Sequence, residues 1–339
     1  MGRATKYNNI TSPELISSIN PENSRLKEEF LQYLRSTQRS EGTIAGYASD
    51  LDIFFVWNAQ KNYNKFFVDI RKRDIIYFQN WLLNENCNSP ARIRRLKASL
   101  SSLANYVENI LDDEYPQFRN IINKIENPVN KPVREKTVLE EEQLKALLDH
   151  LISKGKYMQA CMVSLAASSG ARKSELTRFK LSYFSSENLI CEGALWKTPE
   201  KIKTKGRGLG KYIYKYTLVS QFKPYLDLWI AERNKLGIKS DWLFPSSDPS
   251  IPISTNAMDG WTISYSRILG VPFYWHSLRH YFTTHLSKCG IPDGVIVNIV
   301  GWDSADMCSV YKDIDADDEI SSWFGAEGIK DKSGSLNDL

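Results

Sequence analysis

The spacing of apolar residues changes along the chain from a helical period to a short alternating stretch and back. From Arg25 onward, apolar side chains recur every three or four positions, which predicts amphipathic helices. Four such helices are predicted in the first third of the chain: one carrying Leu26, Phe30, Leu31 and Leu34, one starting near Ser40, one from Asp74 to Leu83 with Asp74 as its N-cap, and one from Pro90 to about Ile110 with Ser89 as its N-cap.

The second part of the chain also has helical spacing, interrupted by one β segment. Thr137-x-x-Glu140 is a capping-box pattern that predicts the first helix there. Around residues 189–219 the period becomes two, with a Gly-rich turn at 206–210 between two alternating runs that reach to Tyr216. This predicts a hairpin with a glycine-rich tip. The predicted fold class is mainly α with a small β-hairpin or sheet, an α+β fold.

A chain of 339 residues exceeds the usual size of one core and fits two domains. The stretch 127–134 has two prolines and few apolar residues, which is typical of a linker. We therefore expect a flexible N-terminal arm (1–23), a helical domain (24–126), a linker (127–136), a second domain (137–325) and a disordered tail (326–339).

The composition is that of a folded protein, with 42% hydrophobic and 25% charged residues. The net charge of +4 permits a nucleic-acid partner but does not by itself indicate one. The five cysteines are scattered without a C-x-x-C pair, which argues against a disulfide framework and favours a reducing compartment. No apolar run approaches the roughly 20 residues of a membrane span. We expect a cytoplasmic protein without a membrane partner.

Two short basic blocks are candidates for anion binding. Gly170 breaks the chain before a predicted helix, so Arg172 would lie in its first turn, where unpaired N–H groups and a guanidinium favour an anion. The lysines of the hairpin could reach into a DNA groove. Taken singly, each block is as easily explained by solvated basic side chains.

Two further blocks carry candidate proton-transfer chemistry. On a helix, His276, Arg279 and His280 would share one face, which suits proton transfer beside charge neutralisation. A zinc site is an alternative for this histidine cluster, although the Glu of the H-E-x-x-H motif is missing. Trp302 and Tyr311 follow nine positions apart; each alone would be explained as a core residue.

Together the four blocks resemble the tyrosine recombinase (phage integrase) family. The pattern of that family is Arg in a G-x-R-x-x-E block, Lys on a β-hairpin, H-x-x-R, and G-(His or Trp) followed by Tyr nine residues later. This chain has Gly170-Ala171-Arg172-Lys173-Ser174-Glu175, Thr204-Lys205-Gly206, His276-Ser277-Leu278-Arg279, and Gly301-Trp302 with Tyr311. The Trp resembles Cre-like members. The first domain resembles the family's core-binding domain through Thr43-x-x-x-Tyr47-x-x-x-Leu51.

The resemblance implies a site-specific DNA recombinase or integrase that cleaves and rejoins DNA through a 3′-phosphotyrosine, without metal, cofactor or ATP. The implied catalytic residues are Tyr311 as nucleophile, His276 as base, Arg172 and Arg279 on the phosphate oxygens, Trp302 as a donor and Lys205 as general acid, with Lys203 and Lys211 as rivals to Lys205. Glu175 and His280 are expected behind them as supporting residues.

The expected partner is double-stranded DNA at recombination sites, which places the protein on host DNA or the nucleoid. The DNA-binding candidates are Arg92, Arg94, Arg95 and Lys97 on one helix, and Lys203, Arg207 and Lys211 on the hairpin; a basic solvent-facing surface is the alternative. In the resembled family, a C-terminal tail docks on a neighbouring subunit to form a tetramer on two sites. Ile320, Trp323 and Phe324 could do so here, or could pack on their own domain.

Three rival functions stay open at this point. A type IB topoisomerase uses the same nucleophile, but that group tends to have Lys where His276 stands. A catalytically silent DNA-binding protein could share the fold. A zinc hydrolase could use the histidine cluster.

Overall fold

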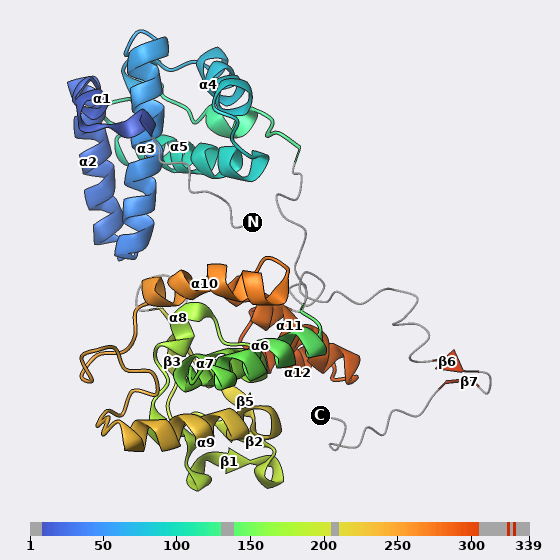
Figure 1. Cartoon of the computed structure of the whole chain (residues 1–339). Helices are drawn as coiled ribbons and strands as arrows, with labels where there is room; N and C mark the ends of the chain where they lie inside the picture. The colour runs from blue at the N-terminus through green and yellow to red at the C-terminus, as the bar shows by residue number, and fades with distance from the viewer. Residues whose placement is uncertain (1–8, 130–138, 205–209, 305–323, 326–327, 330–339) are drawn as a thin grey trace. The chain divides into compact units, whose positions relative to one another are not determined.

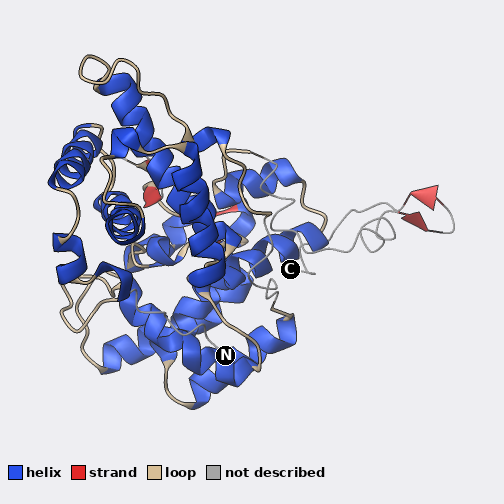
Figure 2. Cartoon of the chain, turned by 90° about the horizontal axis from the view of Figure 1, so that it is seen from above, coloured by secondary structure: helices blue, strands red, loops and turns tan. Residues whose placement is uncertain are grey.

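The structure is a computed structural model, and it describes residues 9–129, 139–204, 210–304, 324–325 and 328–329. The chain divides into two compact units. One consists of residues 4–135 and 206–209, and the other of residues 1–3, 136–205 and 210–339. Helices dominate both units (Figures 1 and 2), and each unit encloses an apolar core of its own.

The N-terminal unit is a helical bundle. Its helices are α1 (Pro13–Ser17), α2 (Pro21–Ser36), α3 (Glu41–Lys61), α4 (Lys72–Asn80) and α5 (Pro90–Ile110), with a π-helical turn η3 (Trp81–Glu85) and 3-10 turns η1 (Asn9–Thr11), η2 (Phe67–Asp69) and η4 (Ile122–Lys124). Helix α3 packs against both α2 and α5. Its fully buried Phe54 meets Phe78 of α4 edge to face, with ring centroids 5.0 Å apart, so aromatic packing ties α4 to the bundle.

Local capping fixes the starts of the two long helices. The Ser40 hydroxyl accepts a hydrogen bond from the Thr43 amide at 3.2 Å, and the Ser89 hydroxyl accepts one from the Arg92 amide at 3.3 Å. Pro90 occupies the first turn of α5, where its missing N–H costs nothing. The predicted starts near Ser40 and Ser89 are confirmed.

The prediction of Asp74 as an N-cap is wrong. Helix α4 begins at Lys72, so Asp74 lies in its first turn, where its carboxylate accepts from the Arg71 amide and the Lys65 ammonium, each at 2.8 Å. An acidic side chain there stabilises the exposed N–H groups of the helix start from inside the helix. Asp is therefore favourable here at the third position of the helix, three residues after the N-cap at Arg71.

Part of the expected flexible arm (1–23) is folded. From Asn9 onward the chain forms η1, α1 and the start of α2, and Ile19 is buried in the core of the bundle. Ser12 caps α1 by accepting from the Leu15 amide at 3.4 Å. Scattered apolar residues in this polar stretch find partners on α3, which the sequence pattern did not indicate.

The other unit is built around one buried helix. Its helices are α6 (Glu141–Ser153), α7 (Tyr157–Ser169), α8 (Lys173–Leu176), α9 (Val219–Lys235), α10 (Thr255–Leu269), α11 (Trp275–Lys288) and α12 (Asp293–Val300), with 3-10 turns η5 (Leu181–Phe184), η6 (Ser186–Asn188) and η7 (Cys191–Gly193). Helix α7 is buried on all sides from Ala160 to its end and packs against α6, α9 and α11. A helix that is apolar all round belongs at the centre of a core.

Short antiparallel strands complete this unit. They are β1 (Leu189–Ile190), β2 (Leu195–Lys197), β3 (Ile202–Thr204), β4 (Lys211–Ile213), β5 (Tyr216–Leu218), β6 (Phe324–Gly325) and β7 (Gly328–Ile329). One sheet has the order β1-β2-β5, and β3 pairs with β4 as the predicted hairpin, with Lys203 opposite Tyr212. The expectation that Tyr216 continues this hairpin is wrong, because Tyr216 pairs with Lys197 of β2. The predicted mainly α fold with small sheets is confirmed.

Two further predictions concern the ends of this unit. The helix expected after Thr137 begins at Glu141, and Gln143 accepts from the Glu140 amide at 3.0 Å; the cap position is therefore Glu140 and the Thr137 pattern was misleading. Of the expected disordered tail (326–339), Gly328–Ile329 form strand β7 against β6, and the rest lies outside the described residues.

Candidate active site

Arg172 is placed by a sharp chain reversal after α7. Gly170 adopts a left-handed conformation, φ +57°, and an added Cβ would lie 2.5 Å from the ring of Phe282. Only glycine satisfies both the backbone conformation and the space. The chain then turns into α8, and Arg172 occupies its cap position, one residue before the first turn in which the sequence placed it.

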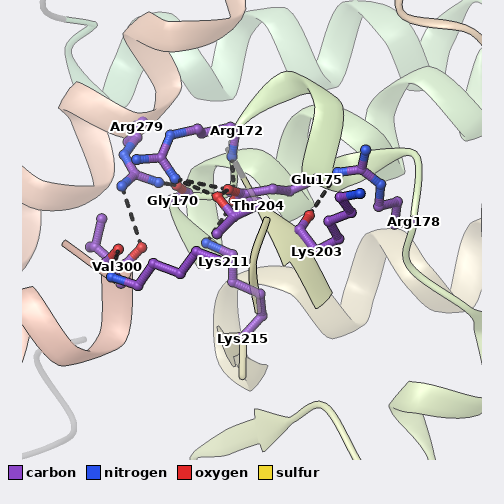
Figure 3. Close-up of polar contacts among 12 residues, drawn as sticks. Gly170, Arg172, Glu175, Arg178, Lys203, Thr204, Lys211, Lys215, Arg279 and Val300 are labelled. Carbon is purple, nitrogen blue, oxygen red and sulfur yellow. Dashed lines mark hydrogen bonds and ion pairs between the residues drawn. The ribbon is translucent and has the colours of Figure 1, made fainter. Parts of the chain in front are cut away.

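The Arg172 guanidinium is held by a carboxylate and a hydroxyl. Its Nη1 donates to Glu175 Oε1 at 2.9 Å and to Thr204 Oγ1 of β3 at 2.8 Å, while its backbone N–H donates to Glu175 Oε2 at 2.9 Å (Figure 3). The Thr204 hydroxyl also donates to Glu175. About a quarter of the Arg172 side chain, 28%, is exposed, so the guanidinium keeps a face toward solvent. This arrangement leaves Arg172 fixed but accessible to an anion.

Lys215 is a member of this cluster that sequence reasoning missed. Its side chain is fully buried, and its ammonium lies 2.8 Å from Glu175 Oε2. Burial alone would raise the pKa of Glu175. The Lys215 ammonium and the hydrogen bonds together outweigh burial and lower that pKa to about 2. Burial lowers the pKa of Lys215 to about 8, although Glu175 opposes that shift. The sequence carried one signal. In an alternating stretch, Lys215 would face the same side as the apolar Ile213, and the neighbouring tyrosines would face the other side.

Arg279 is completely buried on α11, beside the Arg172 cluster (Figure 3). Its Nη1 donates to the Gly170 carbonyl at 2.7 Å and its Nη2 to the Val300 carbonyl at 3.3 Å. Its guanidinium also lies over the Trp302 ring, 5.3 Å from the centroid. The last carbonyls of α7 and α12 thus orient a second guanidinium toward the first.

His276 lies on α11 one turn before Arg279, with its side chain at the surface. Partial burial, His280, Arg279 and Arg172 all disfavour the imidazolium and lower the pKa of His276 to about 4. Near neutral pH its imidazole is therefore neutral and able to accept a proton. The rings of His276 and the buried His280 meet edge to face, with centroids 5.3 Å apart. The supporting role expected for His280 stays a prediction.

Trp302 follows α12, and its ring faces the Arg279 guanidinium. Gly301 is left-handed, φ +76°, and turns the chain so that Trp302 packs in a small apolar cluster with Val300 and Phe282. Next to it, the Lys211 ammonium of β4 pairs with Asp303 and lies 3.4 Å from the Gly301 carbonyl. The hairpin and the end of α12 are thereby connected.

Several expected site residues cannot be placed. Tyr311, Lys205 and Arg207 lie outside the described residues, so the position of the nucleophile and the choice among the lysines stay predictions. Of the rival lysines, Lys203 exposes its side chain on β3, whereas Lys211 is paired with an acid. The structure thus brings together one set of the expected residues: Arg172, Glu175, His276, Arg279, His280 and Trp302.

The basic helix of the N-terminal unit is partly organised by one carboxylate. The buried Asp50 of α3 accepts from Arg92 Nη1 at 2.6 Å and from Arg95 Nε at 3.2 Å. Arg94 instead donates to the Pro128 carbonyl, at 3.0 Å from its Nη2. All three arginines keep accessible surface.

The expectation that Lys97 faces DNA is wrong. Its side chain is buried, and its ammonium donates to Gln79 Oε1 at 2.8 Å and to the carbonyls of Ile125 and Glu126 at 2.9 and 3.1 Å. Burial, and to a lesser extent Arg94, lowers the pKa of Lys97. The side chain fastens the segment after α5 to the bundle, a role that its position among exposed arginines concealed.

Comparison with protein families settles the identity of both units. Residues 137–317 match the family model described as the phage integrase family, and residues 26–117 match its N-terminal SAM-like domain. The chain belongs to the phage integrase family. It is a tyrosine-type site-specific DNA recombinase.

Curated relatives of the recombinase cover most of its length. A recombinase-like protein of the SPbeta prophage, YomM of Bacillus subtilis strain 168, is 29% identical over 245 residues, which cover 71% of this chain and 70% of the relative. The tyrosine recombinase XerC of Caldanaerobacter subterraneus subsp. tengcongensis is 24% identical over 311 residues, covering 85% of this chain and 82% of the relative.

Solved structures show the same fold. A post-cleavage complex of the XerH site-specific recombinase with a palindromic difH substrate matches with a TM-score of 0.64 at 18% identity, covering 88% of this chain and 84% of XerH. A lambda integrase tetramer on a Holliday junction matches with a TM-score of 0.63 at 16% identity, covering 87% of this chain and 77% of the integrase.

The described part of the recombinase has neither a membrane-spanning helix nor a cluster of metal ligands. None of its helices there has the length and apolar character to cross a membrane. Within the same ranges, no group of three or more His, Cys, Asp and Glu side chains could hold a metal ion.

Proposed function

We propose that the recombinase cuts and rejoins double-stranded DNA at specific sites through a covalent 3′-phosphotyrosine at Tyr311. The observation that carries the proposal is the convergence of Arg172 and Arg279, from different elements, beside a neutral His276. Two guanidiniums and an unprotonated imidazole suit the attack of a hydroxyl on a phosphodiester.

In the proposed cleavage step, the phenolic oxygen of Tyr311 attacks the scissile phosphorus. The P–O bond to Tyr311 forms, the bond to the 5′ oxygen breaks, and His276 takes the phenolic proton. A phenol has a pKa near 10, so it needs a base at neutral pH. Lys205 gives a proton to the departing 5′ oxygen, with Lys203 and Lys211 as the alternatives.

Charge stabilisation in this step falls to residues that the protein already holds in place. Arg172 and Arg279 neutralise the non-bridging oxygens as negative charge develops, and the Trp302 indole adds a donor. Rejoining reverses the step when a 5′-hydroxyl attacks the phosphotyrosine. One phosphodiester is exchanged for another, so the proposed reaction needs no ATP. Two arginines and a lysine neutralise the developing charge, so the proposed step also needs no metal ion.

DNA binding is proposed to use basic residues of both units. Arg92, Arg94 and Arg95 on α5 would contact the duplex from the N-terminal unit, and the hairpin would do so from the other through Lys203, Arg207 and Lys211. Phosphate contacts position a protein on DNA, and base contacts then add specificity. For strand exchange, we propose a tetramer on two sites, with the C-terminal segment from Ile320 to Phe324 on a neighbouring subunit.

The proposal is tested by capturing the covalent intermediate. The full-length protein is incubated with fragmented DNA of the source genome and quenched in denaturant, and the DNA that stays attached to protein is sequenced. A defined site from this map is then rebuilt with a nick beside the cleavage position, so that the cut strand diffuses away and the adduct accumulates. We expect an adduct with the wild type and none with Tyr311→Phe.

The same experiment separates the rival functions. If the protein forms the adduct and relaxes supercoiled DNA but never joins two sites, it is a topoisomerase. Non-covalent binding of genomic fragments without any adduct would indicate a silent DNA-binding protein and contradict the proposal. The mass of the undenatured protein–DNA complex tests the tetramer, because two joined sites should carry four copies of the chain.

A further inference from the structure

Among the described lysines near the candidate active site, Lys215 has the most deeply buried ammonium, and the mechanism above gives it no task. It lies between β4 and β5, and Thr198 fixes its backbone on both sides: the Lys215 amide donates to Thr198 Oγ1 at 3.1 Å, and the Thr198 amide donates to the Lys215 carbonyl at 2.9 Å. In Figure 3 its side chain points from below toward Glu175 and Thr204.

Glu175 joins three segments of the chain through one carboxylate. It accepts from the amide and guanidinium of Arg172, from the Thr204 hydroxyl at the end of β3, and from the Lys215 ammonium. Lys205, the candidate general acid, directly follows Thr204 in the sequence. The position of Glu175 therefore affects both the phosphate-binding guanidinium and the strand that leads to the general acid.

Stability is a weak explanation for the Lys215–Glu175 pair. Two fully buried charges lose their hydration, and apolar residues of similar size often replace such pairs without loss of stability. Charge balance offers a better explanation. With Lys215, two cations share one carboxylate, so the cluster keeps a net positive charge at Arg172; without Lys215, the carboxylate would neutralise Arg172 alone.

We propose that Lys215 is a positioning residue that holds Glu175 between β3 and α8 and so keeps Arg172 both oriented and positively charged toward a bound phosphate. Only the expected effect on cleavage rests on the proposed function; the positioning of Glu175 and Arg172 does not. Lys215 acts through Glu175, because its ammonium is enclosed and faces the carboxylate.

The acid–base behaviour of Lys215 supplies an independent signature. The charged groups around it are Glu175, Arg172 and Arg279, and burial with this surrounding charge gives Lys215 a pKa of about 8. As the pH rises through that value, the ammonium is lost and Arg172 becomes paired to an unshared carboxylate. Cleavage by the wild type should then fall above about pH 8. An Arg at position 215 stays charged and should remove that decline.

The experiment compares Lys215→Met and Lys215→Arg in single-turnover cleavage by the full chain. Lys215→Met should slow cleavage by about 10- to 100-fold, the range seen when a residue that supports an active-site group is removed, and Lys215→Arg should restore most of the rate. Arg233→Met is the matched control: Arg233 is a buried cation of the same unit whose guanidinium donates to the carbonyls of Ser240, Trp242 and Leu243 and lies beside the Trp229 ring. It should lower thermal stability but leave the rate of the folded protein unchanged.

Two further readouts distinguish the possible outcomes. A substrate with sulfur at the 5′ bridging position has a leaving group that needs no proton; it should not rescue Lys215→Met, and a full rescue would make Lys215 the general acid and overturn the proposal. The NMR signal of the Arg172 guanidinium in DNA-free protein, assigned with Arg172→Lys, should shift and exchange faster with solvent in Lys215→Met. This signal tests the positioning even if the wild type forms no adduct, and an unchanged signal would overturn the proposal.

Discussion

At the scale of single residues, the surroundings of each site residue decide what it can do. In the proposed reaction, His276 acts as a base because partial burial and three neighbours keep its imidazole neutral. The Arg172 cluster keeps a net positive charge because Lys215 shares the Glu175 carboxylate. The residue types alone permit either protonation state for a histidine near neutral pH. The arrangement of charge in the fold selects one.

The first prediction concerns the pKa of His276. Burial and, after it, positive neighbours disfavour the imidazolium, so the folded protein should bind a proton at His276 only as the pH falls to about 4, well below the ordinary value of 6.5. Arg172→Met removes one of these charges and should raise that pKa. NMR titration of the His276 ring in the DNA-free protein measures both values. A wild-type pKa at or above 6.5 would contradict the assignment of His276 as a neutral base.

Sequence reasoning recovered the site residues whose identity and spacing carry the chemistry. Arg172, His276 and Arg279 stand in short motifs, and the structure places them together. Lys97 was wrongly expected to face DNA, and Lys215 was missed as a site residue. In both cases only tertiary packing reveals that the ammonium is enclosed and bonded. Burial of a single charged side chain is not encoded in the residues beside it.

At the scale of elements, local signals predicted helix starts and long-range contacts decided the rest. Ser40 and Ser89 cap their helices because capping depends only on the next three residues. Strand pairing is different. Tyr216 continued the alternation of the hairpin in sequence, yet it pairs with Lys197 because the chain changes sheets after β4. Nothing near Tyr216 in the sequence marks that change.

The second prediction concerns the attachment of α5 to α3. Asp50 is buried and accepts from Arg92, Arg95 and the Ser99 hydroxyl, so Asp50→Ala leaves three donors without their acceptor. We expect the free energy of unfolding to fall by about 3 kcal/mol, the size typical of breaking a buried ion pair. Urea denaturation of the full chain, followed in the N-terminal unit, measures the loss.

Asp52→Ala is the control on the same helix. Its carboxylate pairs with Lys27 at 2.7 Å and is more accessible than that of Asp50. The loss there should be smaller, because Asp52 has one ion-pair partner at this distance and 16% of its side chain is exposed, against 2% for Asp50. Equal losses in the two variants would show that Asp50 has no special part in anchoring the arginines of α5.

At the scale of the whole molecule, the account assigns DNA binding to both units and chemistry to one. With a net charge of only +4, contact with a duplex requires the basic side chains to be concentrated where the DNA lies. One family model matches the unit that contains the candidate active site, and a second matches the N-terminal unit. The two separate apolar cores agree with this division. DNA binding by both units serves one cleavage reaction only if Tyr311 forms a covalent bond to the DNA.

The most direct test is to identify the amino acid that carries the DNA. The captured adduct is digested with nuclease and trypsin, and the modified peptide is sequenced by mass spectrometry. The tryptic peptide from Cys289 to Lys312 contains Tyr311 as its single tyrosine. The account predicts a nucleotide phosphate attached to that tyrosine through its 3′ end. A nucleotide on any other residue, or a 5′ attachment, would contradict it.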